Sequence, residues 1–93
     1  MNLKDYIRDV PDFPEPGIIF KDITPLLGDA RAFDHVISQL VEKYRDGNFD
    51  AIVPVESRGF LFGAPLAREL RKPIVPVRKP GKLPAETHTT DYE

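Results

Sequence analysis

The sequence predicts an α/β fold in which an open, mainly parallel sheet is flanked by helices. Two short apolar runs, 50–56 and 74–77, are rich in the β-branched residues typical of buried strands, and the residues between them have the apolar period of a helix. A strand, a helix and a strand within about thirty residues form a βαβ unit with parallel strands. Two strands do not complete such a sheet, so the 93 residues are expected to be the front part of one larger domain.

The first 29 residues are expected to combine a short helix with an extended segment. Residues 2–8 have apolar side chains on one side of a helical turn. Residues 10–29 are apolar yet contain four prolines, which forbid a continuous helix because each lacks an N–H and restricts the residue before it. This segment should be ordered, pressed against the core, and should present main-chain N–H and C=O groups at fixed positions.

Residues 30–45 form the clearest predicted helix. Its apolar residues recur at the 3.6-residue period and are Phe33, Val36, Ile37, Leu40, Val41 and Tyr44. Asp29 is the expected N-cap, and Gly47 is the expected C-terminal stop. A second helix is expected from Gly59 to Arg71. Together with the two strands these elements fill residues 30–77, and residues 78–93 form a basic turn followed by a polar loop.

The composition excludes several classes of protein and site. No apolar run approaches the roughly 20 residues of a membrane span, and the first residues lack the apolar stretch of a signal peptide. The absence of cysteine excludes a disulfide framework and a Cys-type zinc site, and two histidines, His35 and His88, exclude a His-rich metal site. A cytoplasmic protein with no metal ligands of its own and no membrane partner is expected.

The charge is distributed unevenly along the chain. Residues 58–82 contain seven basic residues and one acidic residue, although the whole chain has a net charge of −2. A basic stretch on an acidic protein favours a small polyanion over a nucleic acid, for which the whole domain is usually basic. The alternative is that some of these charges lie on a solvated helix face, and this reading is favoured for Arg68, Arg71 and Lys72.

The run VESRGF, residues 55–60, predicts an anion site where the first strand gives way to a helix. Ligands of open α/β sheets bind at the carboxyl ends of the strands, and a helix N-terminus attracts anions. Gly59 allows close approach of the backbone, and Arg58 provides a planar fork for phosphate oxygens. Glu56 and Ser57 complete the corner. The alternative is that Ser57 only caps the helix while Arg58 lies in solvent or pairs with Glu56.

A second basic group follows the second strand. Arg78, Lys79 and Lys82 surround a Pro-Gly turn and should lie on the same edge of the sheet as Arg58, because the carboxyl ends of parallel strands share one edge. Several cations within reach suit a phosphate-dense ligand. The alternative is a basic surface loop.

The run GIIFKDI, residues 17–23, predicts a site for a flat heterocycle. Phe20 offers an aromatic face, and the stiff backbone of Ile19 and Lys21 offers hydrogen-bonding groups beside it. Taken alone, Phe20 is more often a core residue in this kind of sequence.

Three motifs in order, PDFPEPGIIFKDITPLL, ESRGFLFGAPLA and VPVRKPGKLPAET, resemble the first half of adenine phosphoribosyltransferase, a family of type I purine phosphoribosyltransferases. The resemblance runs from about Val10 to Tyr92. It implies part of the type I phosphoribosyltransferase fold, lacking the C-terminal strands, and the Mg²⁺-dependent transfer of ribose 5-phosphate from phosphoribosyl pyrophosphate to adenine. It also implies a homodimer, in purine salvage.

The resemblance assigns roles to the same residues. The corner from Glu56 to Gly59 matches the pyrophosphate loop, with Arg58 as its cation, and Arg78, Lys79 and Lys82 match a basic stretch that approaches pyrophosphate. Phe20 matches the residue that stacks on adenine, and the main chain of Ile19 and Lys21 matches the groups that read the base. The run AETHTTDYE matches the start of a loop that closes over the reacting centre.

Two features of the family have no counterpart in these residues. One is a Glu-Tyr pair used in catalysis, and the other is an acid pair before a Thr/Gly-rich turn that binds the ribose phosphate. The acids after Arg58 are never adjacent, so the catalytic residues are expected beyond Glu93 and the 93-residue chain should be inactive alone. Two other readings stay open: a ligand-sensing or dimerisation module that has lost the chemistry, and a purine enzyme with another base preference.

Overall fold

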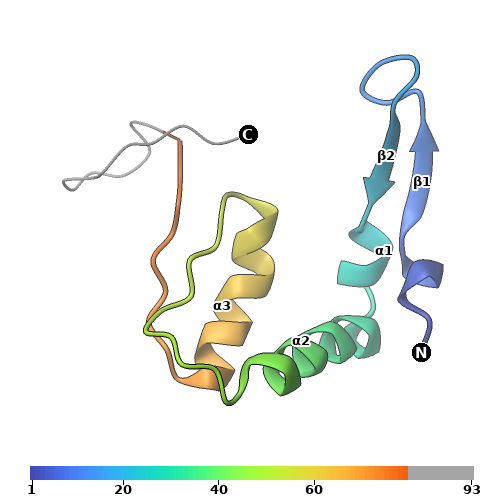
Figure 1. Cartoon of the computed structure of the whole chain (residues 1–93). Helices are drawn as coiled ribbons and strands as arrows, with labels where there is room; N and C mark the ends of the chain where they lie inside the picture. Colours follow the sequence, from blue (N-terminus) through green and yellow to red (C-terminus); the bar gives the residue numbers. More distant parts are fainter. Residues whose placement is uncertain (80–93) are drawn as a thin grey trace. The chain divides into compact units, whose positions relative to one another are not determined.

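The structure, a computed structural model, describes residues 1–79 of the chain. Its elements are, in order, the 3-10 helix η1 (Leu3–Tyr6), the strands β1 (Arg8–Pro11) and β2 (Ile19–Asp22), and the helices α1 (Thr24–Leu27), α2 (Ala30–Tyr44) and α3 (Arg58–Leu70) (Figure 1). The chain divides into two compact units, Met1–Lys43 and Tyr44–Glu93. No helix within residues 1–79 is long and apolar enough to cross a membrane.

The first unit begins with the predicted short helix, which is shorter than expected. Asn2 caps η1 by accepting a hydrogen bond from the Lys4 amide at 3.1 Å. The helix ends at Tyr6 because Ile7 is already extended, and Arg8 belongs to β1 instead. The prediction of a helix over residues 2–8 was therefore wrong at its C-terminal end.

The proline-rich segment was predicted correctly only in part: Ile19–Asp22 are extended and form β2, whose partner strand β1 the sequence did not identify. Thr24–Leu27 are helical instead, and Phe13, Ile18 and Ile19 are exposed rather than pressed against the core. β1 and β2 form an antiparallel hairpin in which Val10 lies opposite Phe20 and Pro11 opposite Ile19. The connecting turn has positive φ angles at Asp12 and Gly17, and the Gly17 amide donates to the Asp12 carboxylate at 3.0 Å. This hairpin fixes the position of the segment predicted to bind a heterocycle.

The carboxylate of Asp22 links the hairpin to α1. It accepts hydrogen bonds from the Thr24 amide, at 2.9 Å, and from the Arg8 guanidinium. The Thr24 amide, then the Thr24 hydroxyl and the Arg8 side chain, favour the charged carboxylate and lower the pKa of Asp22 from 3.8 to about 2.

The pKa of Asp22 predicts an acid-induced loss of stability. A lowered pKa in the folded state means that this contribution is present above about pH 4 and is lost as the pH falls toward 2. Asp22→Asn should remove this part of the pH dependence, measured by urea unfolding between pH 5 and 2. Asp9→Asn, at an exposed ion pair, is the control and should leave it in place. An identical pH profile for Asp22→Asn and the parent chain would contradict the prediction.

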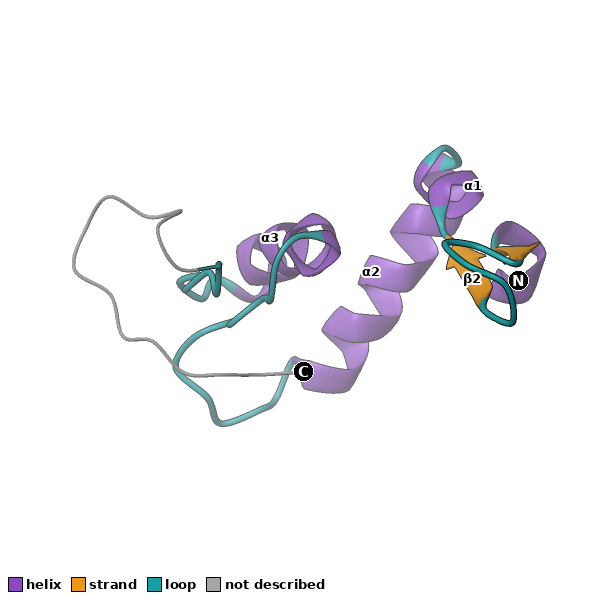
Figure 2. Ribbon diagram, turned by 90° about the horizontal axis from the view of Figure 1, so that it is seen from above, coloured by secondary structure: helices purple, strands orange, loops and turns teal. Residues whose placement is uncertain are grey.

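The helices that follow were predicted in part. α2 confirms the expected helix, and Asp29 caps it by accepting hydrogen bonds from the amides of Arg31 and Ala32, both at 3.0 Å. α2 ends at Tyr44, whose carbonyl accepts a hydrogen bond from Gly47 at 3.0 Å. The four-residue α1 was not predicted. The buried residues of this unit are Leu26 in α1 and Ala32 and Ile37 in α2. Figure 2 shows these two helices.

The second unit contains the predicted parallel pairing, reduced to two isolated bridges. Ile52 pairs with Ile74 and Val55 with Val77. Ile52 donates to Pro73 and accepts from Val75, and the Pro54 carbonyl accepts from Val77, all at 2.9 Å. The bond that an N–H at position 54 would donate to Val75 is missing because proline has no N–H, which divides the ladder. The expected strands over 50–56 and 74–77 are therefore paired but irregular.

α3 covers one face of this pair, as predicted for a βαβ unit (Figure 1). Pro54 is buried beside Gly63, where a Cβ atom would lie 2.7 Å from the Pro54 Cβ. Leu66 and Ala67 of α3 are also buried. The helix ends at Leu70, one residue before the expected end, because Arg71 adopts the left-handed conformation with φ 55°.

Candidate functional site

The corner between the first extended segment and α3 has the geometry of an anion site. α3 begins at Arg58, and the Ser57 side chain makes no capping hydrogen bond. The amides of Ser57 and Gly59 have no hydrogen-bond acceptor within residues 1–79. These donors lie at the positive end of a 13-residue helix, where an anion is stabilised by the dipole. The alternative that Ser57 serves as a side-chain cap does not describe this corner.

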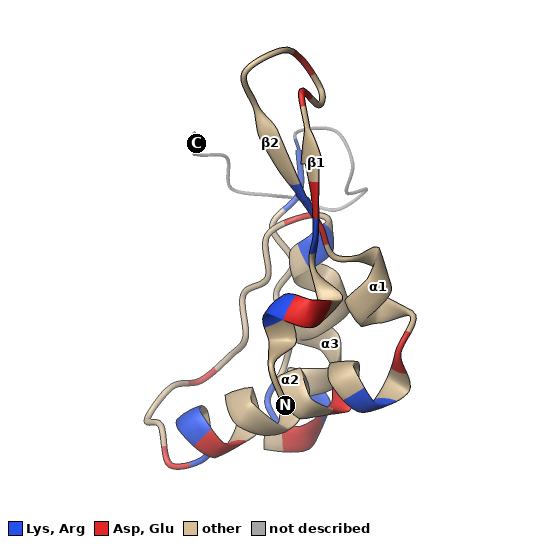
Figure 3. Cartoon of the chain, turned by 90° about the vertical axis from the view of Figure 1, so that its right-hand side faces the viewer, with Lys and Arg blue, Asp and Glu red and all other residues tan. Residues whose placement is uncertain are grey.

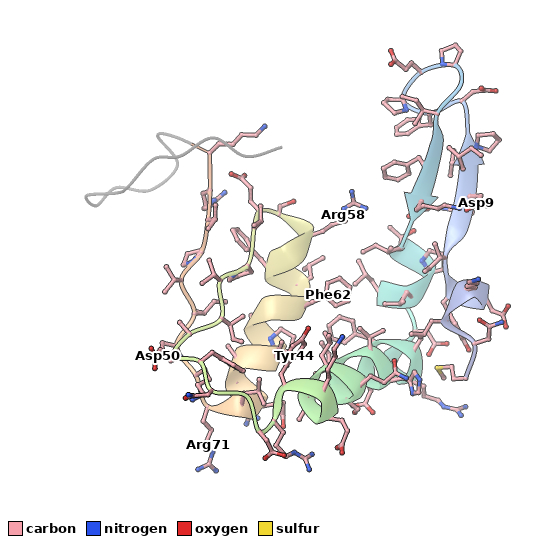
Figure 4. The ribbon with its side chains drawn as sticks, in the orientation of Figure 1. Asp9, Tyr44, Asp50, Arg58, Phe62 and Arg71 are labelled. Atoms are coloured by element: carbon pink, nitrogen blue, oxygen red, sulfur yellow. The ribbon has the colours of Figure 1, made fainter. Side chains whose placement is uncertain are left out.

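Arg58 and Gly59 begin the helix at this corner. Arg58 is exposed, and Figure 4 shows its side chain projecting from the first turn of α3. A Cβ atom on Gly59 would lie 3.7 Å from the Pro54 Cβ, which is an ordinary contact. Packing against the described residues therefore does not require glycine at position 59, in contrast to position 63. The sequence suggested another reason for glycine at position 59, which is close approach of a ligand to the backbone.

The parallel pairing brings the second basic group to the same corner. Glu56 donates its amide to the Val77 carbonyl at 2.9 Å, and its carboxylate accepts a hydrogen bond from the Lys79 amide. The guanidinium of Arg78 lies 5.6 Å from the centre of the Phe60 ring in the first turns of α3. The structure thus brings Arg78 and Lys79 to the corner, while Lys82 lies outside the described residues.

Sequence reasoning missed Phe60 as a partner of Arg78. The two bridges, Ile52 with Ile74 and Val55 with Val77, each join residues 22 positions apart. The same register sets Arg78 level with Glu56, next to the start of α3. That register follows from main-chain pairing and was not readable from composition. The signal that could have identified this contact is the aromatic residue Phe60 at the start of α3, because arginine stacks readily on aromatic faces.

The main chain of Ile19 and Lys21 points away from β1. Pro11 lies opposite Ile19 and has no N–H to donate, so this is a non-hydrogen-bonded pair, and alternation makes Asp9 and Lys21 another. In such pairs the N–H and C=O groups face outward. The described sheet ends at β2, so its outer edge presents these groups as the sequence predicted.

The side chains around this edge leave an aromatic face partly exposed. Phe20 is half-buried, and its ring meets Phe13 edge-on, with centres 5.3 Å apart and planes at 70°. The Lys21 ammonium lies 2.6 Å from the Asp9 carboxylate, so acidic and basic residues lie side by side on the hairpin (Figure 3). The lysine side chain is thus tied to β1 and leaves only its main chain for the outer edge. Phe13 is a member of this cluster that the sequence reasoning did not single out.

The described residues contain no cluster of side chains that could form a metal-binding site. Within residues 1–79, no group of three or more His, Asp or Glu side chains is arranged to hold one. Mg²⁺ often binds through substrate phosphates and water, with few protein ligands. The anion corner is compatible with a metal that arrives with a diphosphate.

Comparison with curated proteins finds adenine phosphoribosyltransferases along the whole chain. The protein from Kosmotoga olearia is 61% identical over 92 residues, which are 99% of this chain and 54% of that protein. The protein from Maridesulfovibrio salexigens is 56% identical over 93 residues, or 100% of this chain and 55% of that protein. The chain therefore spans about half the length of the curated relatives it matches. No family model matches it.

Solved structures give the same result. The adenine phosphoribosyltransferase of Thermoanaerobacter pseudethanolicus superposes with a TM-score of 0.91 at 57% identity, covering 98% of this chain and 54% of that one. The Saccharomyces cerevisiae enzyme, solved with an iminoaltritol bisphosphate and adenine, has a TM-score of 0.80 at 43% identity, covering 90% and 52%. In sequence and in fold, the chain is a homologue of the N-terminal half of the adenine phosphoribosyltransferases and has the corresponding part of the type I phosphoribosyltransferase fold.

Proposed function

We propose that this chain is the part of an adenine phosphoribosyltransferase that binds adenine and the diphosphate of phosphoribosyl pyrophosphate. The reaction transfers ribose 5-phosphate to adenine and releases AMP and pyrophosphate. The corner at Ser57–Gly59 carries the proposal, because the amides of Ser57 and Gly59 lie at a helix N-terminus and have no acceptor within residues 1–79.

One group of residues binds the diphosphate and another group binds adenine. Ser57, Arg58 and Gly59 bind the diphosphate, with Arg78 and Lys79 held beside them and Lys82 beyond the described residues. The outward main chain of Ile19 and Lys21 reads the edge of adenine, and Phe20 stacks on its face.

The metal ion, the cellular location and the oligomeric state are proposed from the resemblance to the adenine phosphoribosyltransferase family. Mg²⁺ accompanies the diphosphate and offsets its charge, with no protein ligand assigned in this chain. We propose that the protein acts in the cytoplasm and as a homodimer.

Calorimetry and an AMP assay on the 93-residue chain test the proposal. We expect saturable binding of inorganic pyrophosphate and of adenine without AMP formation, because the sequence has no acid pair to hold the ribose phosphate. Phe20→Leu keeps apolar volume but loses the ring, and it should weaken adenine binding by about 1–3 kcal/mol, the value of one base stacked on an aromatic side chain. An absence of pyrophosphate binding would overturn the proposal.

The second candidate is a ligand-sensing or dimerisation module with the same fold. The lack of adjacent acids in this sequence favours it over an enzyme that is complete in 93 residues. AMP formation by a longer protein that contains this chain supports the enzyme, whereas binding without turnover in that protein supports the module. Competition among adenine, hypoxanthine and guanine decides the base preference.

A further inference from the structure

Glu56 binds the second extended segment at two positions, Val77 and Lys79. Its amide donates to the Val77 carbonyl at 2.9 Å, and its carboxylate accepts from the Lys79 amide. In a regular parallel ladder, the Lys79 amide would donate to the main-chain carbonyl of Glu56. The side chain has taken the place of that carbonyl at the point where the chain turns into α3.

The carboxylate has no favourable role as a direct contact of an anion. A negative charge beside a diphosphate repels it, and the carboxylate has no proton to donate to phosphate oxygens. Its observed partner is the amide of Lys79, and the guanidinium of the neighbouring Arg78 lies 5.6 Å from the centre of the Phe60 ring.

We infer that Glu56 is a positioning residue whose carboxylate holds the Arg78–Lys79 segment against the anion corner. This inference rests on the proposed diphosphate site. The carboxylate replaces a main-chain acceptor, so the first extended segment can end and α3 can begin while Arg78 and Lys79 stay in register with it. The carboxylate also places one negative charge near the ligand. Its hydrogen bond to the Lys79 amide favours ligand binding by more than this charge disfavours it.

Two substitutions separate the hydrogen bond from the charge. Glu56→Gln keeps an acceptor for the Lys79 amide and removes the charge, so pyrophosphate should bind equally well or more tightly. Glu56→Ala removes both the acceptor and the charge, and it should weaken pyrophosphate binding about three- to tenfold, as expected when a hydrogen bond that positions two cationic residues is lost. Glu69→Ala removes a charge from an exposed position on α3 and is the matched control. If Glu56→Ala binds pyrophosphate as well as or better than the parent chain, the inference is overturned.

Hydrogen exchange at the Lys79 amide tests the same contact without a ligand. Glu56→Ala should speed this exchange, whereas Glu56→Gln and Glu69→Ala should not. If the parent chain binds no pyrophosphate, the proposed function fails, and Lys79 exchange alone decides the inference: unchanged protection in Glu56→Ala overturns it. Should Glu56→Ala fail to fold, Glu56→Asp, whose carboxylate reaches about 1.5 Å less far, carries the same expectation.

Discussion

Arg58→Ala is expected to weaken binding of inorganic pyrophosphate to the chain by roughly 1.5–3 kcal/mol, or about 10- to 150-fold in Kd. Arg58 begins α3 beside the amides of Ser57 and Gly59, which have no acceptor within the described residues. A guanidinium at this point adds two parallel hydrogen bonds and a full charge to the partial charge of the helix. Calorimetry at fixed ionic strength measures the effect, because salt weakens attraction between exposed charges.

Two variants show whether position or net charge is responsible. Arg68→Ala removes the same charge from the far part of α3, where Arg68 is exposed and lies 3.2 Å from Glu69, and it should change Kd little. Arg58→Lys keeps the charge but loses the fork, so its effect should lie between those of the parent chain and Arg58→Ala. Equal losses from Arg58→Ala and Arg68→Ala would mean that the corner is not the binding site.

The two long helices, α2 and α3, were predictable because their signal is local. α2 repeats its apolar residues over four turns and begins at a capping aspartate, so sequence and structure agree to within one residue. β1 has no such signal. Its residues Arg8 and Asp9 are exposed, and they are held by Asp22 and Lys21 across the hairpin. A strand that is stabilised by its partner rather than by its own composition is not visible in a single sequence.

The position of the corner where we propose the anion site was predictable, but the contacts within that corner were not. The change from an apolar run to Ser-Arg-Gly marks the carboxyl end of a strand, and the structure places the start of α3 there. The link from Glu56 to Lys79 and the stacking of Arg78 on Phe60 depend on a register of 22 residues between paired segments. That register arises from main-chain pairing between segments that are distant in the sequence.

The packing of α3 on the pair predicts the other large effect. Gly63→Ala should lower the free energy of unfolding by about 1–3 kcal/mol, the usual cost of inserting a group into a filled space. The added Cβ would lie 2.7 Å from the Pro54 Cβ and 3.0 Å from its Cγ. Proline cannot rotate its ring out of the way, so the backbone of α3 or of residues 52–55 must move.

Gly59→Ala is the matched control, because its Cβ would make only an ordinary contact with the same proline, at 3.7 Å. Both variants gain the helix propensity of alanine, up to about 1 kcal/mol, so the difference between them isolates the steric cost. Urea unfolding followed by helical circular dichroism measures it. In a Pro54→Gly background the cost of Gly63→Ala should largely disappear, since the opposing Cβ is gone. An undiminished cost in that background would mean that close contact with Pro54 is not what requires glycine at position 63.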